Sequence, residues 1–467
     1  MIVMKFGGTS VADGEKILSV ASLVKSFKSK KPIVVVSAMA GITDMLLDTA
    51  RTAQKGNIDK VEESVEIIRK RHKKVVREVA LSKKEKENLE KQVNQSLAEL
   101  LEIYHGIILL KELSPRSLDM VSSFGERISV LLVSAALMKL GVPSYPIDAR
   151  QFVRTDTTFG NAIVNLNVTK RLFRKHIFPQ FKGKSVPVIT GFIGHTKDKL
   201  TTTIGRNGTD YTATIVAYSC GLDCKEVWIW KDVDGVMTAD PRLYPKAKVV
   251  PHLSFQEASE ISYFGGGVIH PRTMQPAVLA DIPIRFKNTF NPESPGTIIS
   301  SENKYLNRYL ITCSIDRLTL ITVEGAGLQA TPEAVVRVLR TVAVAGIHIY
   351  MISMSSSEYN ISFLVRESDT TRVEDLLKKE LHIMQIVEKS ISKIVVEKGV
   401  SIIACVGANL KGRVGIAGRI FSILGKNNIN IIAIAQGSSE YNISMVVDGK
   451  NMKKAVYCIQ EELGKVS

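Results

Sequence analysis

The chain has 467 residues, which is too long for one ordinary domain and predicts about three. Its hydrophobic content of 45% and charged content of 23% are typical of a soluble globular protein. Since no run reaches about 18 apolar residues, we expect no membrane partner. A lysine at position 5 followed by glycines argues against a signal peptide. Five scattered cysteines favour free thiols in a reducing cytoplasm over a metal site.

The formal net charge of +16 can indicate a nucleic-acid or anionic partner. Much of the excess lies between Lys60 and Lys91, where lysines alternate with glutamates on a helical pattern. Such alternation indicates a solvated helix face. The chain has no basic patch interleaved with aromatic residues, so no nucleic-acid partner is expected.

The first stretch predicts a strand, a glycine turn and a helix. Ile2–Met4 is apolar, Lys5 to Ser10 reads Lys-Phe-Gly-Gly-Thr-Ser, and helical spacing begins near Asp13. This order leaves backbone N–H groups free at a helix start, where anions bind. Lys5 could neutralise a transferring phosphoryl group. An ordinary turn after a strand is the alternative, and the chain contains no Walker loop.

A second buried strand is predicted at Pro32–Met39, and a helix follows from Gly41. Ligands bind at the carboxyl ends of strands in open α/β sheets, which makes Ser37 and Thr43 substrate candidates. Helix capping is the other role open to these two residues.

Two long helices are predicted between Asn57 and Leu113, broken near Ser82 and ending before Ser114-Pro115. A further helix is expected to open at Ser123–Arg127 and to continue through Leu140. There Glu126 could bind a substrate ammonium, or it could belong to a charge pair at the helix start.

Further strands are predicted at 143–147, 186–190, 226–230 and 284–287. The loop 201–210 carries glycines and Arg206 into a helix starting near Tyr211, an arrangement that suits a carboxylate or phosphate. Asp210 could cap that helix or orient a catalytic lysine.

The last third contains an internal repeat. Ser356–Ser362 reads Ser-Ser-Glu-Tyr-Asn-Ile-Ser, and Ser438–Ser444 repeats it, each after a helix pattern and an apolar strand. Each copy predicts a ferredoxin-like βαββαβ unit. Two copies imply a pseudo-symmetric pair whose interface could hold a small ligand, with a purely dimerising module as the alternative.

Jointly, seven motifs make the whole chain resemble an aspartate kinase of the amino-acid kinase superfamily with two C-terminal ACT domains. They are Lys5–Ser10, Val36–Met39, Ser123–Arg127, Gly191–Gly194, Gly205–Asp210, Asp232–Gly235 and His270–Arg272. The resemblance implies an α/β fold, namely an αβα sandwich followed by two ferredoxin-like ACT domains. It implies a catalytic domain at 1–300, a linker and strand at 301–317 that joins the C-terminal ACT module, and ACT domains at 318–390 and 391–467.

The resemblance also implies transfer of the ATP γ-phosphate to the β-carboxylate of L-aspartate, the entry to lysine, methionine and threonine synthesis. Lys5 would stabilise the phosphoryl group and Asp210 would orient Lys5. Arg206 would bind the aspartate α-carboxylate and Glu126 its ammonium. The same pocket would include Ser37, Thr43, Phe192 and Thr203. The nucleotide would contact Gly7, Gly8, Thr9, Lys231, Asp232, Met237 and Arg242. Mg²⁺ would be held mainly through the phosphates, without a dedicated protein metal site.

Two departures from the family pattern bear on ATP and effector binding. Many relatives carry lysine where this chain has Gly267, a position thought to reach ATP phosphate; Lys231 or Arg242 could substitute. The repeat resembles the threonine-responsive branch, in which Gln436 would contact threonine while Met354 replaces the equivalent glutamine. Lysine is the alternative effector, and the ACT domains suggest a homodimer or homotetramer. A weakly active amino-acid sensor and another superfamily phosphotransferase are the competing functions.

Overall fold

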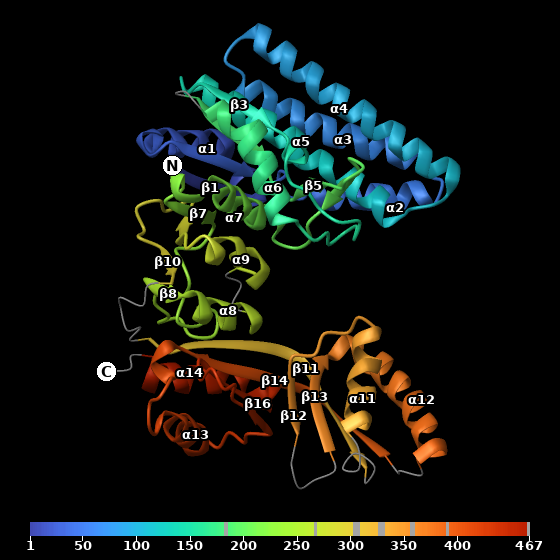
Figure 1. The fold of residues 1–467 in the computed structure, drawn as a ribbon, viewed down its shortest axis with the longest axis vertical. Coiled ribbons are helices and arrows are strands. Elements are labelled where there is room, and N and C mark those ends of the chain that lie inside the picture. Colours follow the sequence, from blue (N-terminus) through green and yellow to red (C-terminus); the bar gives the residue numbers. More distant parts are fainter. Residues whose placement is uncertain are drawn as a thin grey trace. The chain divides into compact units, whose positions relative to one another are not determined.

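A computed structural model describes residues 1–181, 185–265, 269–301, 309–325, 332–354, 360–388 and 392–464. The chain forms two compact units (Figure 1). The first comprises Met1–Val236, Pro251–Phe255 and Ile269–Asn303. The second comprises Met237–Val250, Gln256–Val268 and Lys304–Ser467. A single boundary near residue 300 is therefore too simple, because two internal segments pack with the C-terminal unit.

An eight-stranded sheet forms the centre of the first unit, in the order β3-β4-β2-β1-β7-β9-β10-β8. The strands are β1 (Ile2–Phe6), β2 (Pro32–Val36), β3 (Ser144–Ile147), β4 (Val186–Thr190), β7 (Glu226–Lys231), β8 (His252–Ser254), β9 (Ile284–Asn288) and β10 (Thr297–Ser300). Neighbours from β3 to β9 are parallel, whereas β9 and β10 are antiparallel. The strands that were predicted from apolar runs are confirmed, and the parallel order aligns their carboxyl ends at one edge.

Helices cover both faces of this sheet, as the predicted αβα sandwich requires. One set is α1 (Gly14–Ser26), α2 (Ile42–Gln54), α3 (Ile58–Val79), α4 (Lys83–Leu110) and α5 (Pro115–Lys139). These share a core with Met4 and Phe6 of β1. Successive strand residues point to opposite faces, so Val3 and Lys5 point the other way. There α7 (Gly208–Cys220) packs on β1, and α9 (Pro271–Leu279) packs on α7.

The helix α5 begins earlier than expected. Ser114 caps it with its side chain and Pro115 occupies the first turn, so this pair starts a helix instead of only ending the previous one. Glu126 therefore lies inside α5, and the alternative of a charge pair at the helix start is wrong. Among the described residues, α5 alone is long and apolar enough to cross a membrane, but 83% of its apolar window is buried within the protein.

The second unit contains a six-stranded antiparallel sheet in the order β12-β13-β11-β14-β16-β15. Its strands are β11 (Ile311–Gly325), β12 (Met351–Met354), β13 (Asn360–Arg366), β14 (Ser392–Val406), β15 (Ala433–Ala435) and β16 (Asn442–Asp448). Its helices include α11 (Pro332–Val344), α12 (Thr370–Glu388), α13 (Ile416–Lys426) and α14 (Met452–Leu463). Helix α8 (Phe255–Tyr263) also belongs to this unit, apart from its first residue. Two separate cores, one around α11 and β13 and one around α13 and β16, mark two ferredoxin-like modules.

The long strands β11 and β14 run through both modules. Residues 311–315 pair with 402–406, whereas 319–325 pair with 392–398. The N-terminal part of β11 thus supplies the last strand of the C-terminal module, since no strand follows α14 in the described part of the chain, up to residue 464. A division at residue 390 does not separate the modules, because the first half of β14 completes the sheet of the preceding one.

Candidate active site

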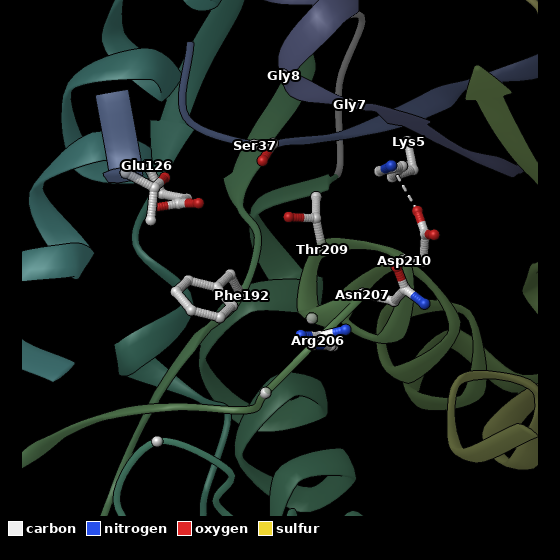
Figure 2. A pocket seen from close by; sticks show the side chains of 14 residues that line it. Lys5, Gly7, Gly8, Ser37, Glu126, Phe192, Arg206, Asn207, Thr209 and Asp210 are labelled. Atoms are coloured by element: carbon white, nitrogen blue, oxygen red, sulfur yellow. Dashed lines mark ion pairs between the residues drawn. The ribbon is translucent and has the colours of Figure 1, made fainter. Parts of the chain in front are cut away.

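A pocket of about 470 Å³ opens at the carboxyl ends of β1 and β2 (Figure 2). Five further segments complete its wall: helix α2 with Thr43, helix α5, the loop around Gly160, the turn after β4 with Phe192, and the loop that enters α7. The lining residues are Lys5, Gly7, Gly8, Ser37, Thr43, Glu126, Gly160, Phe192, Gly205, Arg206, Asn207, Gly208, Thr209 and Asp210. Backbone hydrogen bonds from Ser37 to Phe6 and from Gly191 to Val36 continue the strand alignment into these loops. The sheet thereby brings together segments that lie far apart in the sequence.

A buried ion pair lies on one side of the pocket. Lys5 Nζ is 2.5 Å from Asp210 Oδ1, and both residues are less than 10% exposed. Asp210 occupies the first turn of α7, whose N-cap is Asn207. Capping is therefore not the role of Asp210. Figure 2 shows its carboxylate pointing at the Lys5 ammonium, so that it fixes the position of the lysine.

The turn after β1 leaves room only for backbone. A Cβ at Gly8 would lie 2.9 Å from the carbonyl oxygen of Ala38, and one at Gly7 would lie 3.3 Å from Lys5 Nζ. Glycines therefore allow a ligand to approach the backbone closely. Lys231 ends the neighbouring strand β7, and burial lowers its pKa while the charge of Asp210 raises it and that of Lys5 lowers it. Two lysines thus lie close to this turn, as an anionic ligand requires.

Glu126 presents an unpaired carboxylate oxygen in a buried position. The residue is 2% exposed, and its Oε1 accepts a 3.2 Å hydrogen bond from Ala38 N. Its Oε2 has no hydrogen-bond partner among the described residues. Burial raises the pKa of Glu126 to about 8. A ligand cation would satisfy the free oxygen and favour the ionised form, because nearby opposite charge stabilises a carboxylate.

The loop that enters α7 contributes a cation to the pocket. Arg206 is exposed there and has no ion-pair partner in the described part of the chain. Gly205, Asn207 and Phe192 all have a positive φ, a backbone conformation that non-glycine residues such as Asn207 and Phe192 rarely adopt. Such backbone strain is concentrated at functional sites. The pocket therefore presents a carboxylate from α5 and a guanidinium from this loop, the two charges that complement an α-amino acid.

The pocket brings together nine of the residues proposed from the sequence: Lys5, Gly7, Gly8, Ser37, Thr43, Glu126, Phe192, Arg206 and Asp210. Four others of the same unit do not line it: Thr9, Thr203, Lys231 and Asp232. Thr9 is exposed, and the Thr203 hydroxyl donates instead to Asp119 at 2.7 Å. Thr203 therefore supports the pocket through Asp119, and its hydroxyl does not face the pocket.

The remaining candidates belong to the second unit. Met237 is half-buried there, and Arg242 is exposed and pairs with Asp240 at 2.6 Å. Met354 ends β12 and Gln436 follows β15; both are exposed. These two strands form the edges of the sheet and also lie against each other. Gly267, where relatives carry lysine, lies outside the described residues.

Two residues of the site were not proposed from the sequence. Gly160 lies in an irregular loop, and Asp119 is a buried acid in α5 whose hydrogen-bond partners are Gly160 and Thr203. The one available hint was an acidic residue within an otherwise apolar helix face. The described residues contain no group of three or more histidine, cysteine, aspartate or glutamate side chains that could hold a metal ion.

Comparison with known proteins agrees with this architecture. The amino acid kinase family matches residues 1–288, and the ACT domain family matches 321–381 and 403–463. Aspartokinase 1 from Arabidopsis thaliana is 35% identical, over 98% of this chain and 79% of that protein. Two structures of E. coli aspartokinase III, with lysine and aspartate and with aspartate and ADP, superpose with TM-scores of 0.82 and 0.80 at 27% identity, each covering 99% of both chains. The chain belongs to the aspartokinases, within the amino acid kinase family.

Proposed function

We propose that the protein is an ATP-dependent aspartate kinase, which transfers the γ-phosphate to the β-carboxylate of L-aspartate. One observation carries the proposal: the pocket combines the Lys5–Asp210 ion pair with an oxygen of Glu126 and a guanidinium of Arg206 that are both unpaired in the described part of the chain. An α-amino acid carries both complementary charges. Its side-chain carboxylate would then lie toward Lys5, where a phosphoryl group would be transferred.

The chemistry needs positioning and charge neutralisation more than a general base. The β-carboxylate is already ionised, so one of its oxygens attacks the γ-phosphorus while the bond to the leaving ADP oxygen breaks. Lys5 would neutralise charge on the transferring group. Lys231 and the backbone at Gly7 and Gly8 suit the neighbouring phosphates. Mg²⁺ bound between ATP phosphates would supply further neutralisation and would be held mainly through those phosphates.

The aspartate assignment rests on fit as well as on relatedness. An E. coli aspartokinase III structure contains aspartate and ADP, and this chain shares its fold. The product would be 4-phospho-L-aspartate, the first intermediate on the way to lysine, methionine and threonine. We propose a cytoplasmic location on separate grounds, because the five cysteines are free thiols, as in a reducing compartment.

A trapping assay tests the proposal. Protein, Mg-ATP and L-aspartate are incubated with hydroxylamine, and both ADP release and the hydroxamate are measured. We expect hydroxamate from aspartate, but not from glutamate, whose carboxylate lies one methylene further out, nor from N-acetylaspartate, which lacks the ammonium for Glu126. Turnover with glutamate alone would indicate another phosphotransferase. Threonine binding without any turnover would favour an amino-acid sensor.

We propose further that the ACT modules bind a feedback effector, with threonine favoured and lysine the alternative. Gln436 and Met354 occupy equivalent positions after β15 and at the end of β12, and these strands lie against each other.

Apolar Ile352, Met354 and Ile434 are exposed on the same edge strands. Exposed apolar edges favour pairing with another chain, which supports a homodimer or homotetramer through the ACT modules. Light scattering after size exclusion tests it, and an Ile434→Asp variant should dissociate.

A further inference from the structure

Asp119 is a buried carboxylate without a cationic partner. It is 2% exposed, and no lysine or arginine pairs with it among the described residues. Instead its oxygens accept hydrogen bonds from Gly160 N at 3.0 Å, from Thr203 N at 2.8 Å and from Thr203 Oγ1 at 2.7 Å. Burying a charge is costly unless hydrogen bonds compensate. The groups that compensate here come from two other segments of the pocket wall.

These hydrogen bonds join three walls of the pocket. Asp119 and Glu126 are seven residues apart in α5, so they lie on nearly the same side of the helix, about 10 Å apart along its axis. Gly160 lines the pocket from the loop 156–163. Thr203 ends the strand β6 (Thr201–Thr203), and the chain reaches Arg206 three residues later. One carboxylate therefore links the wall that carries Glu126 to the wall that carries Arg206.

The loop 156–163 is held from a second side by Arg272. This residue lies in the His270–Arg272 motif at the start of α9, for which the reaction itself has no evident use. Arg272 Nη1 donates to Asn161 Oδ1 at 2.7 Å, and Nη2 donates to the Ala162 carbonyl oxygen. Its guanidinium also lies 5.3 Å from the ring centroid of Tyr211, the residue after Asp210. Arg272 thus ties the loop to the helix that carries Asp210.

The same loop also bonds directly to β6. Ala162 N donates to the carbonyl oxygen of Thr203 at 2.9 Å. The carboxylate of Asp156 accepts from Thr158 and Ile163 and closes the loop on itself. The loop is therefore ordered internally, and its position depends on β6 and on two side-chain anchors, Asp119 and Arg272. Neither anchor lines the pocket.

We propose that Asp119 and Arg272 are positioning residues that hold the loop 156–163 and so set the distance between Glu126 and Arg206. The inference rests on the proposed function, since that distance selects an α-amino acid whose side-chain carboxylate reaches Lys5. Loss of either anchor would remove no group that contacts substrate, but it would let the two walls shift relative to each other. A displacement of about 1 Å can cost about a hundredfold in rate. The loss should fall on aspartate and spare ATP.

The test uses the full chain and the variants Asp119→Asn and Arg272→Ala. Asparagine keeps the size of the side chain, but its NH₂ group cannot accept from a backbone N–H. We expect the KM for aspartate to rise by about tenfold or more in each variant, the KM for ATP to stay within about twofold, and the preference for aspartate over glutamate to fall. Arg272→Lys, which keeps one donor, should recover part of the loss. Because both anchors act on one loop, the double variant should lose less than the product of the single losses.

A matched control separates positioning from general stabilisation. Arg174 donates to the Ser219 and Cys220 carbonyl oxygens at the opposite end of α7, far from the pocket residues of that helix. Arg174→Ala should lower Tm without changing the KM for aspartate. An aspartate KM that stays at the wild-type value in both anchor variants would overturn this inference but not the proposed function. A rise of the KM for aspartate and the KM for ATP together, in proportion to the loss of Tm, would also overturn it, because a purely structural role predicts that result. Wild-type protein that phosphorylates no amino acid would overturn the proposed function together with it.

Discussion

Lys5 at the end of β1 and Asp210 in the first turn of α7 form a buried ion pair with a separation of 2.5 Å. The central strand of the sheet presents Lys5 to the face that α7 covers, so the lysine cannot leave the site without leaving its carboxylate unpaired. A cation fixed in this way needs no reorganisation when phosphoryl charge develops.

Replacing Lys5 with alanine should lower kcat by about a hundredfold to a thousandfold, because one preorganised charge at the transferring group is lost. The variant should also lose stability, by about 3 kcal/mol or more, since Asp210 stays buried without its partner. Steady-state rates and thermal unfolding measure the two effects separately. Lys16→Ala, which removes a partly exposed lysine paired with Asp13, is the control. An unchanged kcat in Lys5→Ala would remove this residue from the mechanism.

The raised pKa of Glu126 predicts the pH dependence of aspartate binding. Because burial raises this pKa to about 8, the free protein at pH 7 holds Glu126 largely protonated, and a protonated carboxyl cannot pair with an ammonium. The value of kcat/KM for aspartate should therefore rise with pH through about 8. Glu126→Gln should abolish this rise and increase the aspartate KM. The control is Glu226→Gln, since Glu226 pairs with Arg285 at the start of β7. A profile that stays the same in Glu126→Gln would exclude this group as its source.

The raised pKa of Glu126 also makes the stability of the protein fall as the pH rises. Folding raises the pKa of Glu126, so the folded protein binds its proton more tightly than the unfolded chain does. The stability from this group is therefore complete below the unfolded pKa of about 4.5 and is lost as the pH rises through about 8. Glu126→Gln should be less sensitive to this rise in chemical denaturation measured at pH 6 and pH 9.

Arg206→Ala should mostly raise the KM for aspartate, by about tenfold to a hundredfold, because a charged hydrogen bond to a carboxylate contributes about 1.5–3 kcal/mol. The ATP KM should change little, since Lys5 and Lys231 lie nearer the glycine turn. Initial rates over a grid of both substrates distinguish the two. If the ATP KM rose instead, the loop 205–210 would bind nucleotide and the orientation of the substrates would have to be reversed.

Much of the site follows from local sequence because its residues lie at strand ends and helix starts. Lys5, Gly7 and Gly8 end an apolar run, and Arg206 and Asp210 precede a helical pattern. Parallel strands bring such segments to one edge. This reasoning found eight of the pocket residues, and the family resemblance added Phe192. It mistook Ser123–Arg127 for a helix start, since a polar stretch inside a long buried helix resembles a boundary.

The features that could not be predicted from the sequence depend on contacts between distant segments. Asp119 bonds to Gly160 and Thr203, and nothing in the residues around it indicates either partner. The boundary between the two modules was misplaced at residue 390 for the same reason, because only strand pairing shows that residues 392–398 pair with 319–325. The family resemblance, and not local sequence, implied that a strand within 301–317 joins the C-terminal module, and the pairing of 311–315 with 402–406 agrees with it.

His72 should make stability depend on pH in the acid range. It is fully buried in α3, where Nδ1 donates to the Ile68 carbonyl oxygen at 2.7 Å, and burial lowers its pKa to about 4. The unfolded chain takes up this proton below about 6.5, so stability falls as the pH drops from about 6.5 to 4, by up to about 3 kcal/mol. A His72→Gln variant should show a shallower fall between pH 7 and 5 in urea unfolding. His176→Gln, at an exposed position, should retain the wild-type slope, and equal slopes in all three proteins would contradict the assignment.

Gln436→Ala should weaken threonine inhibition while leaving uninhibited turnover within about twofold. Gln436 is exposed directly after β15, so its removal disturbs no core, but loss of a side-chain hydrogen bond to the effector should raise the half-inhibitory concentration by about tenfold. Met354→Ala, at the equivalent position of the other module, is the matched control and should change inhibition less, since methionine offers no comparable donor. Activity is measured at a fixed aspartate concentration near KM while threonine, and in parallel lysine, is titrated. Full threonine sensitivity in Gln436→Ala would contradict the effector site. Inhibition of the wild type by lysine alone would keep the enzyme and reassign its effector.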